Sequence, residues 1–445
     1  MTIGAVSVSR RSVLTASLAA AVGAVAAGCA QPSRAQWTPA GAAGPPPAGS
    51  KPPTQRPAPS PTAPRGTTPG QAPTKLAATL SRFLRPTPQN PKHPTYAGAV
   101  ALVTVGGKVK TRAAVGDALR YTAGPVELPA AKRVPMRDDS IFDLASITKV
   151  FTAILALQQV DKGRLDLAAP VSKYLPGFAG AGKPTVTVEM LLTHTSGLPV
   201  GASVTGMSSN AARRAAVLAT PLVKGAVPGK TFRYSSVGLM VTAYLVELLA
   251  GQSLDRALKA GITDPLGLRD TGFKPLTWLS KADQAQRLVA TDARTGRGLL
   301  RGTVHDDVAN IMGGVAGSAG VFSTAADLAV IGELLLNGGT HSGKRILSEA
   351  TVRRMLTNAN RGKPAVDAER PQRTADHGLG VELNQPWFMG KLAGPRTFGH
   401  TGFTGTSLVV NPDRGLVFVL LTNRAHPNWS WADPDPARVE AANAV

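Results

Sequence analysis

The sequence predicts an α+β fold, in which strands from both ends of the folded region form one antiparallel sheet and a mostly helical lobe is inserted between them. Apolar residues alternate over 97–115, and strand patterns return only after residue 396. Between them, from Ile141 onward, apolar residues recur at three- and four-residue steps for roughly two hundred residues, as they do in helices. Two strand-rich ends therefore flank a helical middle.

The first strands are predicted to form a hairpin. Folded sequence begins near Lys75 with a short helix over 76–84, and the dipeptide Gly106-Gly107 then interrupts the alternating stretch. A Gly-Gly pair between two strand patterns indicates a two-residue turn.

The inserted lobe begins with a helix that follows Ser146. Thr324 and Asp327 form a capping pattern at the start of a later helix. Further helices are predicted at 188–192, 210–218, 237–249, 253–258 and 328–336, and the closing strands at 397–401, 407–410 and 416–421. The folded domain is placed at 75–424, and residues 425–445 are predicted to form a loose polar tail.

The chain has 445 residues, of which 43% are apolar, and a formal net charge of +22. No Asp or Glu precedes Asp117, whereas thirteen Lys and Arg do, so much of the positive excess lies in the N-terminal part. The sequence contains neither a basic nucleic-acid-binding motif nor aromatic platforms for bases. We therefore expect attraction to an anionic lipid or wall polymer, and no nucleic-acid partner.

Residues 1–29 have the pattern of an export signal. Arg10-Arg11 gives a twin-arginine start, and the uncharged Ala-rich run over 15–28 is too short for a permanent membrane span. The run ends in Ala26-Ala27-Gly28-Cys29, which is similar to the lipobox of bacterial lipoproteins, although Ala26 stands where Leu is commonest. We expect Cys29 to be acylated and to anchor the protein to the outer face of the cytoplasmic membrane.

Cys29 is the only cysteine, so no disulfide can form within the chain. A free thiol in the signal is the alternative to lipidation. Residues 30–74 are rich in Pro, Ala and Gly and cannot bury a core, so they are predicted to be a disordered tether.

Ser146 and Lys149 are the strongest catalytic candidates within the helical pattern. Residues three apart on a helix are neighbours, so the Lys149 amine can reach the Ser146 hydroxyl. The positive end of the helix dipole also favours a developing alkoxide. Ser146 could therefore act as a nucleophile, with Lys149 as the adjacent proton acceptor.

Three further stretches strengthen this interpretation: residues 191–199 (LLTHTSGLP), residues 228–238 with Tyr234, and residues 398–405 with His400. In this order and spacing they resemble the serine β-lactamase and penicillin-binding protein family, nearest its class C-like esterase and D,D-peptidase branches. The resemblance covers roughly residues 94–422. It implies a β-lactamase/transpeptidase-like fold and an enzyme that needs no cofactor.

The resemblance also implies a role for each residue. Ser146 would be the acylated nucleophile, Lys149 its partner, and Tyr234 the residue that relays protons and activates the deacylating water. Because a phenol titrates near pH 10, Tyr234 needs neighbouring cations, for which Lys149 and a protonated His400 are the candidates. The oxyanion hole would consist of the backbone N–H groups of Ser146 and Phe403.

The remaining substrate-binding residues are Ser236, His400, Thr401 and Gly402, two of which depart from the commonest pattern. Ser236 stands where many relatives have Asn, and His400 where β-lactamases have Lys. We expect His400 to be protonated only part of the time near neutral pH. Both changes weaken the case for efficient β-lactam hydrolysis and fit the esterase and atypical peptidase branches.

A second serine and several histidines offer other candidate sites. Residues 316–320 (AGSAG) resemble a nucleophile elbow, in which a helix begins directly after the serine. The next predicted helix start is only at Thr324, so a packed Gly-rich loop is favoured. Residues 304–323 resemble a segment of cell-envelope relatives of the penicillin-binding type. Isolated histidines lack the paired spacing of metal ligands, so no metal is expected: His194, His305, His341 and His377.

The sequence therefore predicts an exported, lipid-anchored serine hydrolase that forms an acyl-enzyme at Ser146. Its substrate would be an ester or a D-amino-acid peptide of the cell envelope, possibly from peptidoglycan, as for an esterase or a D,D-carboxypeptidase. A β-lactamase is the first alternative. A non-catalytic lipoprotein that binds peptidoglycan or senses penicillin is an alternative of another class.

Overall fold

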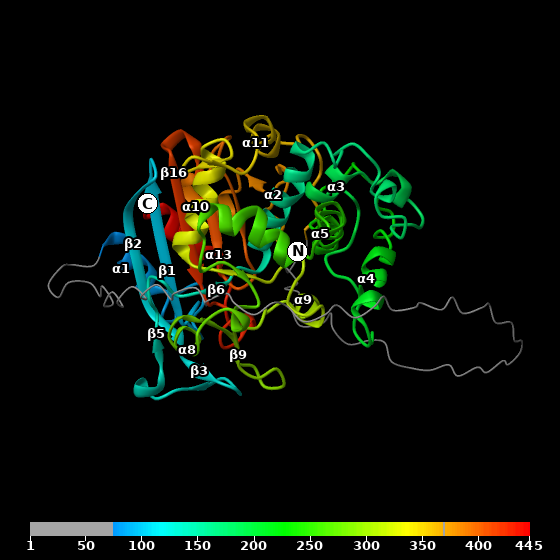
Figure 1. The fold of residues 1–445 in the computed structure, drawn as a ribbon. Helices are drawn as coiled ribbons and strands as arrows, with labels where there is room; N and C mark the ends of the chain where they lie inside the picture. Colours follow the sequence, from blue (N-terminus) through cyan, green and yellow to red (C-terminus); the bar gives the residue numbers. More distant parts are fainter. Residues whose placement is uncertain (1–73, 368–369) are drawn as a thin grey trace, which may run out of the picture. The chain divides into compact units, whose positions relative to one another are not determined.

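The computed structural model of this protein describes residues 74–367 and 370–445 (Figure 1). The predicted export signal, Cys29 and the tether lie outside these residues, except for the last position of the tether.

The central sheet has seven antiparallel strands in the order β13-β14-β15-β16-β1-β2-β5. Strand β1 pairs with β2 through a turn at Gly106-Gly107 and with β16 on its other side, with Val100 opposite Leu421. The predicted hairpin and the joining of the two chain ends in one sheet are both confirmed. The strands are β1 (Gly98–Val105), β2 (Lys108–Leu119), β5 (Val134–Pro135), β13 (Glu382–Leu383), β14 (Phe398–Thr401), β15 (Ser407–Asn411) and β16 (Leu416–Thr422).

Alternate residues of β1 enter two separate cores, as the period of a strand requires. Val100 and Leu102 belong to the large core shared with the helical lobe. Ala101 and Val103 belong to a smaller core on the opposite face, which the terminal helices α1 (Lys75–Arg82), α12 (Pro386–Met389) and α13 (Asp435–Asn443) help to form. Helix α10 (Ala325–Leu336) packs against β1, β15 and β16 and shares the large core (Figure 1).

Helix α2 (Thr148–Asp161) packs against α5 (Ser236–Ala250), and both are buried on nearly every side. The sequence pattern indicated one broad apolar face for α2, but Thr148, Lys149 and Thr152 are buried as well. The remaining helices are α3 (Val188–Leu192), α4 (Asn210–Ala219), α6 (Leu254–Leu258), α7 (Asp264–Leu266), α8 (Lys281–Arg287), α9 (Asp307–Ile311) and α11 (Glu349–Met355).

Short strand pairs join the loops of the lobe. A three-stranded sheet contains β6 (Phe142–Asp143), β10 (Val321–Ser323) and β7 (Gly272–Phe273), and it leads directly into the turn before α2. The other pairs are β3 (Tyr121–Thr122) with β4 (Val126–Glu127), β8 (Ala290–Asp292) with β9 (Leu300–Arg301), and β11 (Thr340–His341) with β12 (Lys344–Arg345).

The prediction of a loose tail over 425–445 is wrong. This segment contains α13, whose Ala437 and Ala441 are buried against the sheet-side core. Small apolar residues four apart form a narrow helical face, which polar neighbours obscure in the sequence. The folded domain therefore continues past residue 424.

Within the described residues, no single helix has the length and apolar character to cross a membrane. Helix α5 and the segment that follows it reach that threshold together, but they are bent by 75° relative to each other.

Candidate active site

Ser146 lies in a tight turn between β6 and α2. Ala145 precedes it with a φ of +47°, a left-handed conformation that is uncommon for a residue with a Cβ. The buried Asp143 carboxylate stabilises this turn, because it accepts hydrogen bonds from the N–H of Ala145 (2.9 Å) and of His305 (2.7 Å). Burial raises the pKa of Asp143, and these two hydrogen bonds oppose the rise. Ser146 itself is in a short 3-10 turn that leads into α2, so its predicted place at the helix start is confirmed.

Lys149 is fully buried in the first turn of α2. Its Nζ donates to the Ser146 Oγ at 2.9 Å, which confirms the contact predicted from the three-residue spacing. The Ser318 carbonyl accepts a second hydrogen bond from Nζ at 3.0 Å. This second partner was not foreseen, and it fixes the Lys149 Nζ against the nucleophile.

The loop at 316–320 supports Lys149 and is not a nucleophile elbow. The Ser318 side chain is buried, and β10 follows the loop, whereas an elbow requires a strand before the serine and a helix after it. Gly317 contacts α5 so closely that a Cβ there would lie 2.1 Å from the Leu239 carbonyl oxygen. The Thr152 hydroxyl donates to the Gly317 carbonyl at 2.8 Å. The preferred interpretation of a packed Gly-rich loop is confirmed.

Tyr234 lies on the loop before α5, as predicted, and the structure brings it to Lys149. The Lys149 Nζ is 4.9 Å from the centre of the Tyr234 ring, and the Arg373 guanidinium carbon is also 4.9 Å away. The next residue, Ser235, caps α5 by accepting a hydrogen bond from the Gly238 N–H. The cap fixes where the loop ends and therefore where Tyr234 lies.

His194 supports Tyr234 and was not predicted to be part of the site. It has a φ of +56°, is fully buried, and accepts a hydrogen bond at Nδ1 from the Ser235 N–H. Its ring centre lies 4.7 Å from that of Tyr234. The motif at 191–199 contains His194, but only the fold shows that its ring faces the tyrosine.

His400 differs from the expectation of a partly protonated residue. It is 1% exposed, its Nδ1 is 2.8 Å from the Thr401 carbonyl, and its ring centre is 6.3 Å from that of Tyr234. Burial, with a further contribution from Lys149, lowers the pKa of the His400 imidazole to about 3. The side chain is therefore neutral near pH 7, and the prediction that it supplies a cation beside Tyr234 is wrong.

The second cation beside Tyr234 is instead Arg373. It is 6% exposed and forms ion pairs with Asp367 at 2.7 Å and Glu382 at 3.6 Å. Its charge is thus shared with two carboxylates. Nothing in the local sequence indicated that residue 373 would reach the tyrosine, because a long loop and β13 separate it from the predicted motifs.

The loop after β14 contacts the nucleophile turn directly. The Thr404 hydroxyl donates to the Asp143 carbonyl at 2.7 Å, and that of Thr406 to the Leu144 carbonyl at 3.1 Å. Gly402 lies so close that a Cβ there would be 2.3 Å from the Leu144 carbonyl oxygen. The segment that contains the predicted residues Thr401, Gly402 and Phe403 is therefore packed against the residues that lead into Ser146.

The described residues provide no hydrogen-bond acceptor for the backbone N–H of Ser146 or of Phe403. Two free donors on adjoining turns are what an oxyanion hole requires. β14 is a near-edge strand, because its only outer neighbour, β13, pairs with Phe398 and Gly399 and stops before His400.

Ser236 begins α5, and its N–H donates to the Val200 carbonyl at 3.0 Å. Its hydroxyl makes no hydrogen bond within the parts of the chain that the structure describes. The structure thus places Ser236 two residues after Tyr234 without showing a role for its side chain.

Histidines that are isolated in the sequence are not isolated in the fold. The rings of His194 and His377 are 4.9 Å apart, and the His305 Nε2 is 3.3 Å from Asp292. Burial lowers the pKa of His377 to about 4 and that of His194 well below its usual value. Among residues 74–367 and 370–445, no three His, Cys, Asp or Glu side chains are grouped as metal ligands, and the expected lack of a metal stays a prediction.

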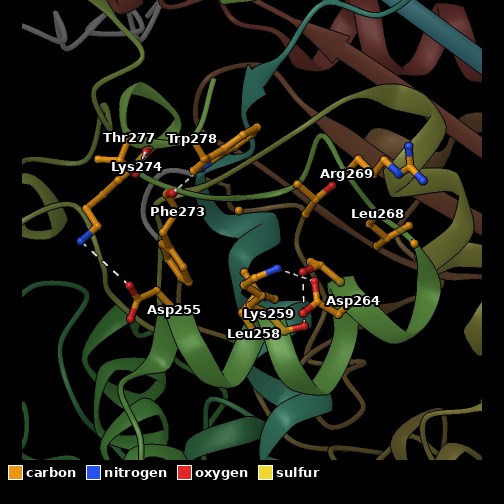
Figure 2. A pocket seen from close by; sticks show the side chains of 14 residues that line it. Asp255, Leu258, Lys259, Asp264, Leu268, Arg269, Phe273, Lys274, Thr277 and Trp278 are labelled. Atoms are coloured by element: carbon orange, nitrogen blue, oxygen red, sulfur yellow. Dashed lines mark hydrogen bonds and ion pairs between the residues drawn. The ribbon is translucent and has the colours of Figure 1, made fainter. Parts of the chain in front are cut away.

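A cavity of about 760 Å³ lies apart from these residues, between α6 and the loop around Trp278. Figure 2 shows two ion pairs among its charged side chains, with Lys274 directed toward Asp255 and Lys259 toward Asp264, while Arg269 lies apart from both pairs. None of the predicted site residues lines this cavity.

A Ser-Lys pair at the start of a buried helix, a Tyr beside the Lys and a near-edge strand against the Ser define the class of the protein. In a fold of one antiparallel sheet with a helical lobe, they are the parts of a serine hydrolase with the β-lactamase/transpeptidase-like architecture.

Comparison with known proteins agrees with this class. The model of the Beta-lactamase family matches residues 88–443, so the chain belongs to that family. A protein of Escherichia coli (strain K12) named "Putative D-alanyl-D-alanine carboxypeptidase" is 32% identical over 365 residues, which make up 74% of this chain and 79% of that protein.

Solved structures show the same fold at lower identity. EstCE1, described as a hydrolase with promiscuous acyltransferase activity, has a TM-score of 0.62 and 20% identity, and the match covers 83% of this chain and 97% of EstCE1. A penicillin-binding protein homologue from Caulobacter crescentus has a TM-score of 0.58 and 22% identity, with 84% and 98% of the two chains covered.

Proposed function

We propose that this protein forms an acyl-enzyme at Ser146 on an ester or a D-amino-acid peptide of the cell envelope, which water then hydrolyses. The observation that carries the proposal is the 2.9 Å hydrogen bond between the Lys149 Nζ and the Ser146 Oγ, with the amine fully buried. A hydroxyl becomes a nucleophile when a basic group can take its proton as it attacks.

The attack would place negative charge on the carbonyl oxygen of the substrate. The free N–H groups of Ser146 and Phe403 belong to turns that Thr404 and Thr406 tie together. Donors that are held in place before the reaction stabilise the tetrahedral intermediate without reorganisation.

Tyr234 would carry protons between the substrate and Ser146, first to the leaving group and then from the deacylating water. Lys149 and Arg373 both lie beside its ring, so negative charge that develops on the phenol oxygen is partly balanced. General acid–base assistance of this kind contributes about 10²- to 10⁴-fold to a rate.

The neutral state of His400 bears on the substrate class. A lysine at this position would offer a permanent charge to the carboxylate of a β-lactam, whereas the pKa of His400, lowered by burial to about 3, leaves it uncharged. The missing charge therefore ranks hydrolysis of an ester above that of a β-lactam, whereas a D-amino-acid peptide with a free C-terminal carboxylate gains nothing from it. The name of the Escherichia coli relative favours the peptide.

Three substrates test the ranking: a p-nitrophenyl ester, a D-Ala-D-Ala peptide and a chromogenic cephalosporin. We expect turnover of the ester or the peptide, slow turnover of the cephalosporin, and loss of all activity in Ser146→Ala. Rapid cephalosporin turnover would reverse the ranking. Unchanged ester turnover in Ser146→Ala would refute the mechanism.

A non-catalytic peptidoglycan-binding role is the second candidate, favoured by the departures at Ser236 and His400. A fluorophosphonate probe separates the two, because a hydrolase is labelled at Ser146 and a binding module is not. Mass spectrometry of the labelled peptide identifies the residue, and Ser146→Ala is the matched control.

A further inference from the structure

Arg438, on α13, is a buried cation that contacts residues 402–406, called here the oxyanion loop. It is 1% exposed, and its Nη2 donates to the carbonyls of Gly402 at 2.6 Å and Thr406 at 3.0 Å. Its Nη1 donates to the Asp435 carboxylate at 2.6 Å. One guanidinium therefore joins the C-terminal helix to both ends of a five-residue loop.

The loop between those two carbonyls contains Phe403, whose N–H is free. Within the loop, the Gly402 N–H donates to the Thr406 carbonyl at 2.8 Å, and the Gly405 N–H to the Gly402 carbonyl at 3.0 Å. Arg438 adds a second, charge-assisted donor to each of these acceptors, and such bonds are stronger than neutral ones. Arg438 thereby constrains the turn that contains the Phe403 N–H.

Burying a guanidinium removes it from water at a cost of several kcal/mol unless it is well paired. Asp435 balances its charge, and the Asp435 carboxylate also accepts a hydrogen bond from Arg370 at 3.1 Å. The rigid plane of the guanidinium suits contacts with a carboxylate and with carbonyls at once, which a lysine ammonium cannot reproduce.

We propose that Arg438 is a positioning residue that fixes the Phe403 N–H of the oxyanion hole through the carbonyls of Gly402 and Thr406. The proposal rests on the proposed function, because it assumes that this N–H stabilises an oxyanion formed at Ser146. Through this loop, α13 would influence the rate of acyl transfer, although the sequence pattern predicted only a loose tail there.

The test compares Arg438→Met with a control on the same helix. Removing the guanidinium leaves the loop less constrained, and displacing one oxyanion donor should lower kcat for a p-nitrophenyl ester about 10- to 100-fold. KM should change less than about threefold, because the donor acts mainly in the transition state. Affinity for phenylboronic acid, whose adduct with Ser146 places an oxygen in the same hole, should fall by a factor similar to that of kcat.

Glu440→Gln is the matched control. Glu440 is on α13 and forms an ion pair with Arg82 of α1 at 2.8 Å, away from the oxyanion loop. This variant should lower thermal stability slightly and leave kcat and boronate affinity unchanged. Arg438→Lys should lie between wild type and Arg438→Met, since an ammonium retains the charge but not the planar set of donors.

A folded Arg438→Met with wild-type kcat and boronate affinity would overturn the proposal, as would a change confined to KM. Should Arg438→Met not fold, Asp435→Ala carries the test, because it keeps Arg438 and removes the acceptor that orients its guanidinium. Unchanged kcat and boronate affinity in that variant would contradict the proposal. A wild type that turns over none of the substrates refutes the proposed function. The role of Arg438 is then measured by comparing the rates at which wild type and Arg438→Met are labelled by the fluorophosphonate. A wild type that is not labelled either would end both proposals.

Discussion

Lys149 has two hydrogen-bond partners, of which only one could be predicted from the sequence. Its contact with Ser146 follows from a three-residue spacing on a helix. Its contact with the Ser318 carbonyl joins positions 169 residues apart, and only the fold provides it. Short-range geometry can be read from a motif, whereas the long-range partner that holds the amine cannot.

Lys149→Met is expected to lower kcat by about 10²- to 10⁴-fold, because it removes the proton acceptor beside Ser146. The steady-state rate on a p-nitrophenyl ester measures the loss. Lys183→Met is the control: Lys183 is also buried and donates to a single backbone carbonyl, that of Leu218. We expect the control to lose stability and keep kcat, and equal losses in the two variants would contradict the assignment.

Tyr234→Phe is expected to lower turnover by about 10²-fold or more with the fold retained, because the ring keeps its packing and loses the hydroxyl that carries protons. Intact-protein mass spectrometry after mixing with an ester should show accumulated acyl-enzyme if deacylation is the slower step. Tyr244→Phe on α5 removes a comparable hydroxyl whose one hydrogen-bond partner among the described residues is the Met312 sulfur at 3.9 Å, and it should have little effect. Near-normal turnover in Tyr234→Phe would remove Tyr234 from the proton path.

The charge of His400 is the residue-scale property that sequence reasoning missed. The residue type and its place in the motif were visible, but its protonation depends on burial behind Tyr234 and near Lys149. Burial of an individual side chain follows from tertiary packing, so an ordinary histidine pKa was the natural but wrong expectation.

At the scale of elements, strong periodicity was a reliable guide. The hairpin at Gly106-Gly107, the helices around Tyr234 and Thr324, and the three closing strands all occur within a few residues of their predicted bounds. Helix α13 was missed because its buried residues are three alanines together with Asp435 and Arg438, a set with no apolar period to read in the sequence. β13 was missed because a two-residue strand has no readable period.

The loop at 316–320 offers a test of how an element supports Lys149. In Gly317→Ala the new Cβ would meet the Leu239 carbonyl of α5, so the loop must shift and carry the Ser318 carbonyl away from Lys149. We expect about 1–3 kcal/mol of destabilisation together with a clear loss of kcat.

Urea unfolding and ester turnover measure these two effects. Gly394→Ala, where a Cβ would make only an ordinary 3.6 Å contact with Thr397, should preserve both. If Gly317→Ala is destabilised but retains full kcat, the loop does not position Lys149.

At the scale of the whole molecule, several buried histidines make stability depend on pH. Burial lowers the pKa to about 4 for His377 and to about 3 for His400 and His426. In the unfolded chain these groups take up protons below about pH 6.5, while in the fold they stay neutral until about pH 4 or 3. The unfolded state thus binds more protons in this window, and the free energy of unfolding falls as the pH falls from about 6.5 toward 4.

Urea titrations at pH 7.5, 6.0 and 5.0 measure this dependence. His426→Gln, away from Ser146, should reduce the slope, because it removes one of the protonating groups. A free energy of unfolding that is constant between pH 7.5 and 5.0 would contradict the buried, neutral state of these side chains. The same pKa of about 3 leads us to expect no His400 titration in the kcat profile near pH 6.5.

The location of the protein is a further whole-molecule proposal. We propose that the chain is exported and held at the membrane through lipid on Cys29, as the twin-arginine start and the lipobox-like sequence indicate. Cys29→Ser should move the protein from the membrane fraction to the soluble fraction in cell fractionation, with ester turnover unchanged. Continued membrane association of the variant would refute the anchor.

The pairing of β1 with β16 sets a condition on how the protein is made. Ser146, Lys149 and Tyr234 are synthesised long before β14, and β1 cannot pair with β16 until the whole helical lobe between them has been synthesised. A chain that stops short of residue 398 holds the nucleophile and its base but lacks the strand that completes the site. Premature termination would therefore give an inert fragment with an unpaired sheet edge, a substrate for quality-control proteases, and not a slower enzyme.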